Sequence, residues 1–231
     1  MVTVTNWGLL LRKELAQKAK HFATANGLTH YESLGRSPTI LFPAEPATSS
    51  HGNFNDKSYA AILANASWAN WLQKPHSQRL RTLPKDRRRD AKELDSSNSW
   101  DALLMNCFCY PGSVERILQG CLQTTPTGPV EFGVGGDVPQ RNGKPDTTEL
   151  DMRVGNIVCE AKLTESDFTS KRATVVEAYR DLHDVFDASL LPRVEGKYQS
   201  YQLIRNVLAA AAHCDPGVKD AFEHVYTSVL G

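Results

Sequence analysis

The stretch that decides the fold runs from residue 149 to residue 162 and reads Glu149-Leu-Asp-Met-Arg-Val-Gly-Asn-Ile-Val-Cys-Glu-Ala-Lys162. In it, two runs of alternating polar and apolar residues flank the pair Gly155-Asn156. Glycine and asparagine tolerate the positive φ angles that a two-residue hairpin turn requires. The stretch therefore predicts a β-hairpin, in which Val154 faces Ile157 across the turn.

The predicted hairpin has one apolar and one charged face, because successive side chains of a strand point in opposite directions. The apolar face consists of Leu150, Met152, Val154, Ile157, Cys159 and Ala161. The charged face consists of Glu149, Asp151, Arg153, Val158, Glu160 and Lys162. In this register Asp151 lies directly opposite Glu160, with Cβ atoms roughly 5 Å apart, and Glu149 lies opposite Lys162.

The facing carboxylates of Asp151 and Glu160 indicate a cation site. Like charges opposite each other across strands are unfavourable, and a cation between them removes the repulsion. Mg²⁺ suits this arrangement, because it takes one or two carboxylates and fills its other positions with water and phosphate oxygens. The alternative is a solvated face with cross-strand ion pairs such as Glu149–Lys162, worth less than about 1 kcal/mol. The conflict between the two facing carboxylates counts against that alternative.

Asp151, followed after eight residues by Glu160-Ala161-Lys162, resembles the D…(D/E)xK signature of the PD-(D/E)XK nuclease superfamily. The motif is short, and the resemblance covers about residues 98–230 as an order of elements. It implies the restriction-endonuclease-like fold, with Asp151 on the second core strand and Glu160 and Lys162 on the third.

The resemblance also implies a role for each residue of the motif. Asp151, Glu160 and the backbone carbonyl of Ala161 would bind Mg²⁺, with Mn²⁺ as an alternative. Lys162 would orient the attacking water or stabilise charge that builds on the phosphate. Glu149 would bind a second metal ion or hold Lys162 in place.

Three further expectations come from the order of elements in the superfamily. A helix near the site often carries a glutamine; Gln202 is favoured here over Gln199, although either fits an ordinary polar position on a half-exposed helix. An earlier helix sometimes supplies an acid, for which Asp101 and Glu115 are candidates. Pro145-Asp146 also reads PD, but it lies too far before the turn, so we expect a loop there.

Length and composition are those of a globular protein with a sizeable core. The chain has 231 residues, of which 41% are hydrophobic and 23% are charged, and its formal net charge is zero. Bulk electrostatic attraction to nucleic acid is therefore not expected, and such binding needs a local basic patch. No apolar run reaches the length of a membrane span, and no signal peptide is recognisable, so we expect a cytoplasmic protein without membrane contact.

The five cysteines predict neither a disulfide framework nor a zinc site. They are Cys107, Cys109, Cys121, Cys159 and Cys214. Their number is odd and their spacing matches no standard zinc arrangement. We expect buried thiols in a reducing compartment.

The N-terminal part, residues 1–97, is predicted to be a helical extension of a core at residues 98–231. Apolar residues recur at helical spacing over residues 7–24 and again over 57–73, and a Pro- and Ser-rich extended connection lies at 30–56. The apolar residues of the first helix are Trp7, Leu10, Leu11, Leu15, Ala19 and Phe22.

Residues 79–92 are the most basic stretch of the chain, with seven basic residues against two acidic ones. Such a cluster can neutralise phosphates and release counterions, and Arg87, Arg88 and Arg89 are its centre. A solvated loop accounts for the cluster equally well.

The remaining elements follow from local signals. Ser99 is expected to cap a helix through Phe108, and further helices are expected at 114–123, 170–190 and 197–212. Val130–Val134 predicts the first core strand, with a turn at Gly135-Gly136 and a loop at 137–147. Phe222–Leu230 predicts the last strand.

These observations predict an α/β fold, with a central mixed sheet of four or more strands flanked by helices and an α-helical N-terminal extension. The predicted function is metal-dependent hydrolysis of phosphodiester bonds, with DNA as the favoured substrate. The alternatives are a catalytically inactive nucleic-acid- or protein-binding module of the same fold and an RNA-directed phosphodiesterase. The sequence leaves the oligomeric state open, a homodimer included.

Overall fold

The computed structural model describes residues 7–33, 38–44, 50–76, 90–122, 125, 127–155, 157–165 and 168–213. The chain divides into two compact units, Met1–Phe132 with Ala161–Ser166, and Gly133–Glu160 with Asp167–Gly231. We call them the N-terminal and the C-terminal unit and describe each by itself. The predicted boundary at 97/98 does not coincide with this division, which falls inside strand β3 (Val130–Val138).

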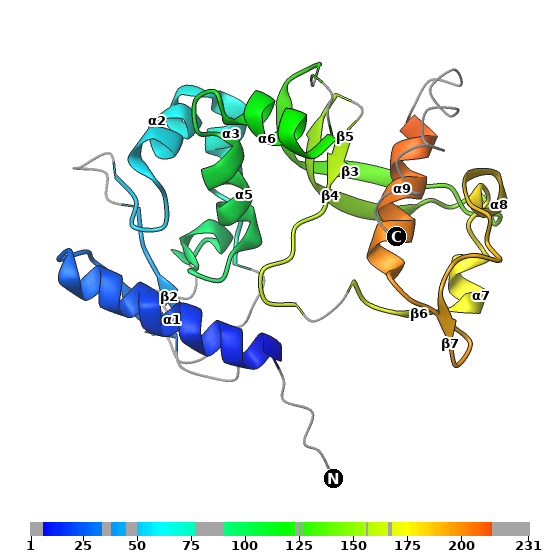
Figure 1. Cartoon of the computed structure of the whole chain (residues 1–231), viewed down its shortest axis with the longest axis horizontal. Coiled ribbons are helices and arrows are strands. Elements are labelled where there is room, and N and C mark those ends of the chain that lie inside the picture. The colour runs from blue at the N-terminus through cyan, green and yellow to red at the C-terminus, as the bar shows by residue number, and fades with distance from the viewer. Residues whose placement is uncertain are drawn as a thin grey trace, which may run out of the picture. The chain divides into compact units, whose positions relative to one another are not determined.

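The first helix of the N-terminal unit, α1 (Trp7–Ala25), confirms the prediction for residues 7–24 (Figure 1). The side chains that it buries differ from the expected ones. Ala16 and Ala23 pack against Ile40 and Phe42, whereas the larger apolar residues stay at the surface. The exposed fractions are 77% for Trp7, 45% for Leu10, 40% for Leu11 and 50% for Phe22. The small residues of α1 allow close packing there.

The connection predicted as extended at 30–56 contains a two-stranded antiparallel ribbon. Strands β1 (Tyr31–Ser33) and β2 (Thr39–Leu41) pair with Glu32 opposite Ile40. All three residues of β2 are buried, because α1 covers this strand. The ribbon therefore belongs to the core of the N-terminal unit.

A second cluster of the N-terminal unit surrounds Ile62, Leu94 and Met105. Helices that contribute to it are α2 (Asp56–Ala64), α3 (Ala66–Trp71), η1 (Glu93–Asp95) and α5 (Trp100–Phe108), and α6 (Ser113–Leu122) follows them in the chain. The single helix predicted at 57–73 is wrong, because Asn65 ends one helix and accepts hydrogen bonds from the first turn of the next. The predicted cap at Ser99 is confirmed by its bond from the Ala102 amide.

The C-terminal unit contains the predicted hairpin. Strand β4 (Asp146–Val154) pairs antiparallel with β5 (Ile157–Cys159), with Val154 opposite Ile157 and Met152 opposite Cys159. This register is the one predicted from the sequence. Gly155 has a φ of 59°, as the turn requires.

Two predictions beside the hairpin are wrong. The pair Gly135-Gly136 makes no turn, because β3 runs through it to Val138 and lies beside β4 in the sheet order β3-β4-β5. Pro145-Asp146 is no loop either, since Asp146 is the first residue of β4. The loop expected at 137–147 is thus shorter at both ends.

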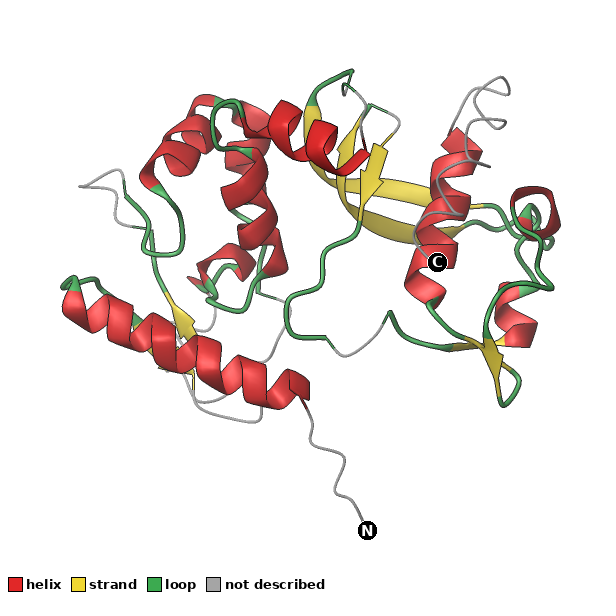
Figure 2. Cartoon of the chain, viewed as in Figure 1, coloured by secondary structure: helices red, strands yellow, loops and turns green. Residues whose placement is uncertain are grey.

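The α/β class holds, but the described sheets are small (Figure 2). The largest described sheets have three strands each, and the expected sheet of four or more strands is not seen among the described residues. The strand predicted at Phe222–Leu230 lies outside the described residues.

The second half of the C-terminal unit differs from the two helices predicted at 170–190 and 197–212. The described elements are β6 (Lys171–Arg172), α7 (Ala173–Val176), α8 (Leu182–Val185), β7 (Arg193–Val194), β8 (Lys197–Tyr198) and α9 (Tyr201–His213). The three strands form a small sheet in the order β6-β8-β7. Tyr198 and Gln199, expected on a helix, therefore precede α9.

Helix α9 forms the core of this unit together with β3 and β4. Ile204, Leu208 and Ala209 pack with Val138 and Leu150. The approach is close at Gly136, where an added Cβ would lie 2.9 Å from the Ala209 Cβ and 3.3 Å from Thr148 Cγ2. Glycine at this position allows α9 to lie against the sheet.

Gly136→Ala should destabilise the protein by about 1–3 kcal/mol, because the added methyl group overpacks the contact with Ala209. Gly135→Ala is the matched control, since a Cβ there meets nothing within 4 Å. It should be neutral or stabilise by about 0.4–1 kcal/mol through the unfolded chain. Denaturant unfolding of both variants checks this, and equal stabilities would contradict the packing described here.

Candidate functional site

Asp151 lies in the middle of β4 and is only 7% exposed. Its neighbours Leu150 and Met152 are buried, as the predicted apolar face requires, and Glu149 is exposed. On the predicted charged face of the hairpin, the side chain of Asp151 is therefore shielded from solvent, whereas that of Glu149 is accessible to it. A buried carboxylate is stable only when it is paired, hydrogen-bonded or coordinated to a metal.

The hairpin ladder ends immediately before Glu160. Its last pair joins Met152 and Cys159, and the same register carried one residue further sets Asp151 opposite Glu160. Because Glu160 lies beyond the end of β5, this facing pair stays a prediction. The Glu160 side chain is half-buried and does not point into an apolar core, because its carboxylate has a polar partner on α9.

That partner is Asn206, which the sequence analysis missed. Its Nδ2 donates to Glu160 Oε2 at 2.7 Å, and its Oδ1 accepts from Thr148 Oγ1 at 3.3 Å. Thr148 and Asn206 are 7% and 5% exposed, so this chain of hydrogen bonds is enclosed. Thr148 orients the amide so that its N–H groups face the Glu160 carboxylate.

Gln202, the predicted helix residue, lies one turn before Asn206 in the first turn of α9. Its backbone N–H donates to Phe168 O at 3.1 Å, and within the described chain its side chain makes no hydrogen bond. The i, i+4 spacing puts Gln202 and Asn206 on one side of the helix. A polar residue in the apolar run of α9 was the available signal for Asn206.

The rest of the motif follows Glu160 in the segment Ala161–Ser166, which groups with the N-terminal unit. Lys162 Nζ lies 5.7 Å from the centroid of the Trp100 ring. The backbone N–H groups of Leu163 and Thr164 both donate to Glu165 Oε2 at 3.1 Å. The loop after the motif is thus ordered by its own glutamate.

Asp101, a candidate acid from the earlier helix, is bound by a lysine of the N-terminal unit. It is 1% exposed, and its Oδ2 accepts from Lys74 Nζ at 2.8 Å. Glu115 lies in the first turn of α6, where a carboxylate favours the helix dipole.

The donor atoms of the hairpin suit a hard cation. Among the described residues, no group of three or more His, Cys, Asp or Glu side chains is placed to hold a metal ion. Mg²⁺ does not require such a group, because one or two carboxylates with water and phosphate oxygens suffice. Ligating carboxylates are commonly oriented by a hydrogen bond from behind, and the amide of Asn206 supplies such a bond to Glu160.

A second polar cluster surrounds Asp146 at the start of β4. Its Oδ2 accepts from the Tyr179 hydroxyl at 2.5 Å and from the Tyr201 hydroxyl at 3.3 Å, and Arg205 lies 3.8 Å from Oδ1. Burial, followed by the hydrogen bonds to Asp146 and Tyr201, raises the pKa of Tyr179. This cluster ties β4 to α9, and no motif in the sequence predicts it.

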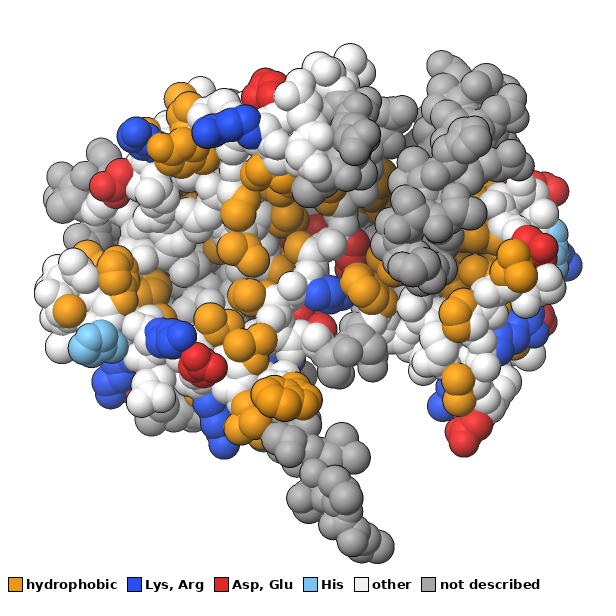
Figure 3. All heavy atoms as spheres, viewed as in Figure 1, with side chains coloured by type: hydrophobic (Ala, Val, Ile, Leu, Met, Phe, Trp, Pro, Cys, Tyr) orange, Lys and Arg blue, Asp and Glu red, His pale blue; other side chains and the backbone are white. Residues whose placement is uncertain are grey.

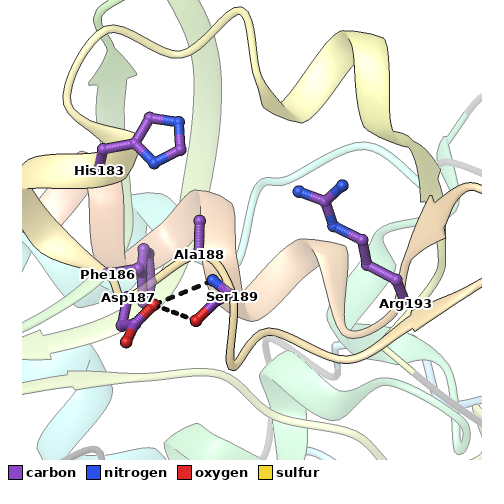
Figure 4. Close-up of a pocket in the computed structure, with 6 residues that line it drawn as sticks. All are labelled: His183, Phe186, Asp187, Ala188, Ser189 and Arg193. Atoms are coloured by element: carbon purple, nitrogen blue, oxygen red, sulfur yellow. Dashed lines mark hydrogen bonds between the residues drawn. The ribbon is translucent and has the colours of Figure 1, made fainter.

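A pocket of about 730 Å³ lies elsewhere in the C-terminal unit (Figure 4). It is lined by His183, Phe186, Asp187, Ala188, Ser189 and Arg193. The Ser189 amide and hydroxyl donate to Asp187 at 3.0 and 2.6 Å, which lowers the pKa of this carboxyl. None of the predicted site residues lines this pocket.

The expectation of buried thiols holds for one of the three cysteines whose side chains the structure describes, Cys107, Cys109 and Cys159. Cys109 is buried, and burial raises the pKa of its thiol to about 12. Cys107 is exposed and Cys159 is half-buried, and none of these three cysteines forms a disulfide. The wrong expectation for Cys107 follows from its position on the outer side of α5.

A family model described as Restriction Endonuclease associating with ARP, REase-ARP, matches residues 15–227 of the chain. The match includes the hairpin, the segment with Lys162 and helix α9. No curated protein and no solved structure matches the chain significantly. Among the described residues, no helix combines the length and the apolar character needed to cross a membrane.

The Tyr179 cluster predicts a loss of stability at alkaline pH. The raised pKa of Tyr179 keeps its hydroxyl protonated in the folded protein, whereas in the unfolded chain it ionises near pH 10. Its contribution is complete below about pH 10 and is lost as the pH rises further. Tyr179→Phe should cost about 1–3 kcal/mol at pH 7 and flatten this decline. Denaturant unfolding from pH 7 to pH 11 checks this, and equal alkaline slopes would contradict the assignment.

Proposed function

The chain belongs to the REase-ARP family, and from this premise we propose that it is a metal-dependent nuclease that hydrolyses phosphodiester bonds in DNA. One observation carries the proposal beyond family membership. The glutamate of the D…ExK motif is held by a buried amide at the end of a hairpin whose other strand carries the motif aspartate. A solvated ion-pair face has no need for that enclosed support.

The carboxylates of Asp151 and Glu160, with the Ala161 carbonyl, would hold Mg²⁺, and Mn²⁺ is the alternative. The ion would supply charge neutralisation at the phosphate and lower the pKa of a bound water. Asn206 keeps Glu160 in one orientation, so that the carboxylate is set before the ion binds. The low exposure of Asp151 strengthens its interaction with a cation, because water screens it little.

The other motif residues act on the substrate rather than on the ion. Lys162 carries three N–H donors and no acceptor, so it orients the attacking water or stabilises charge on the phosphate. Glu149 is exposed on the same predicted face and either holds Lys162 or binds a second ion. Gln202, one turn from Asn206, is assigned to the water or the phosphate.

The rival proposal is a binding module of the same fold without catalysis. The family description supports it, since it names an association with ARP. Two acids and a lysine in the motif favour hydrolysis, because a binder of phosphate gains nothing from buried carboxylates. An RNA-directed phosphodiesterase would use the same residues, and substrate comparison decides between the two nucleic acids.

The test uses Asp151→Asn, Glu160→Gln and Lys162→Ala in the full chain, with plasmid and linear DNA. The first two remove ligand charge and should abolish cleavage and weaken Mg²⁺ or Mn²⁺ binding measured by calorimetry. Lys162→Ala should keep ion binding and lose most turnover, because lysine does not ligate a cation. Folding stability should stay equal or rise in Asp151→Asn, since repulsion with Glu160 is relieved.

The matched control is Asp184→Asn, which makes the same change at an exposed carboxylate of α8. It should keep wild-type cleavage and ion binding. EDTA should stop cleavage by the wild-type protein. A wild-type protein that binds no divalent ion, even with DNA present, would defeat the nuclease proposal and favour the binding module.

The basic stretch also enters this proposal, although Arg87, Arg88 and Arg89 lie outside the described residues. If they contact phosphates, changing all three to alanine should reduce the slope of log affinity against log salt by about 3. Fluorescence anisotropy with duplex DNA in EDTA measures the slope. An unchanged slope would assign the stretch to a solvated loop.

A further inference from the structure

The small sheet that precedes α9 is unusually basic. Four of its six strand residues are cations, Lys171, Arg172, Arg193 and Lys197. Strand β8 is central, with Lys171 and Arg193 opposite Tyr198, and with Arg172 and Val194 opposite Lys197. Residues opposite each other share a face of the sheet, so the four cations divide between two faces.

The face of the sheet that carries Tyr198, Lys171 and Arg193, which we call the inner face, has a structural role. Tyr198 is completely buried, Arg193 stacks 4.0 Å from its ring centroid, and an Arg193 nitrogen lies 2.9 Å from Glu177. Lys171 Nζ lies 5.3 Å from the ring centroid of Tyr201. Cation–π contacts and an ion pair therefore account for both cations of this face.

On the opposite, outer face, which carries Arg172, Val194 and Lys197, no comparable contact among the residues that the structure describes explains the cations. Arg172, Lys197 and Val194 are all exposed, and Arg172 lies directly opposite Lys197. Like charges in this position are destabilising. In the described part of the chain, neither cation forms an ion pair. The acid nearest to Lys197 in sequence, Glu195, occupies the exposed turn between β7 and β8. Basic and acidic side chains are visible at the free end of this hairpin in Figure 3.

The backbone around this sheet is strained. The described residues other than glycine with positive φ are Thr169 at 60°, Glu195 at 49° and Ser200 at 54°, and all three border its strands. For a β-branched residue such as Thr169 this conformation is an outlier. Hydrogen bonds fix it, since Tyr201 N donates to Thr169 O at 3.0 Å. Strain that the surroundings hold in place is typical of functional segments.

The sheet leads directly into α9. The helix begins at Tyr201, and Asn206 follows five residues later, which corresponds to about 7.5 Å along the axis. The phosphates of one DNA strand repeat every 3.4 Å or so along the duplex. The sheet and Glu160 belong to the same compact unit. The rise from the start of α9 to Asn206 corresponds to about two phosphate steps.

We propose that the outer face of the β6-β8-β7 sheet binds the phosphate backbone of DNA through Arg172 and Lys197. The inference rests on the proposed function and adds to it a contact with the DNA backbone outside the motif residues. Phosphate between the two cations removes their mutual repulsion. The contact is independent of base sequence, because it involves the backbone alone.

The experiment measures binding of the full chain to duplex DNA in EDTA, so that no cleavage is needed. Arg172→Ala with Lys197→Ala should weaken binding equally for unrelated sequences and reduce the salt slope by about 2. The melting temperature should stay equal or rise, because two opposed charges are removed. Lys197→Arg keeps the charge and should keep the wild-type slope.

The matched control is Arg180→Ala, which removes an exposed arginine of the same unit that is paired with Asp181 at 2.7 Å. It should leave the salt slope unchanged. Slopes that are equal for wild type and double variant overturn the inference and leave an acidic protein as the partner of this face. Cleavage is assayed separately with Mg²⁺: loss of binding by the double variant of a protein that cleaves nothing supports the inference and defeats the nuclease proposal.

Discussion

The hydrogen bond from Asn206 to Glu160 is the contact on which the proposed site depends. It joins the end of the hairpin to α9, and Thr148 fixes the amide from the strand side. The bond forms where α9 lies close against the sheet, and at Gly136 an added Cβ would lie 2.9 Å from the Ala209 Cβ. The close packing at Gly136 thus contributes to the orientation of the Glu160 carboxylate.

The local elements with a chemical signal were predictable from sequence. The register of the hairpin follows from Gly155-Asn156 and the alternation of the flanking residues, and Ser99 marks the start of α5. The wrong predictions concern positions where tertiary packing overrides local preference. Gly135-Gly136 suggested a turn, yet the second glycine is needed inside a strand for the approach of α9.

The site was predictable as a motif but not as a set of contacts. Asp151, Glu160 and Lys162 stand out by spacing, whereas Asn206 acquires its role only when α9 packs on β4. The residues before Tyr201 fit a helical pattern, so the sequence predicted a helix that begins earlier. In the structure these residues form β8, which pairs with two short strands. Long-range pairing of two-residue strands leaves almost no periodic signal in a sequence.

The shortness of β5 has a consequence for association between copies of the chain. In the described sheet β5 is an outer strand, and it has three residues. An outer strand exposes backbone groups to which a strand of another molecule can add, and a short one provides few of them. Because the ladder ends before Glu160, the sheet offers few backbone groups for edge-to-edge aggregation. The same ending leaves Glu160, Ala161 and Lys162 outside the strand.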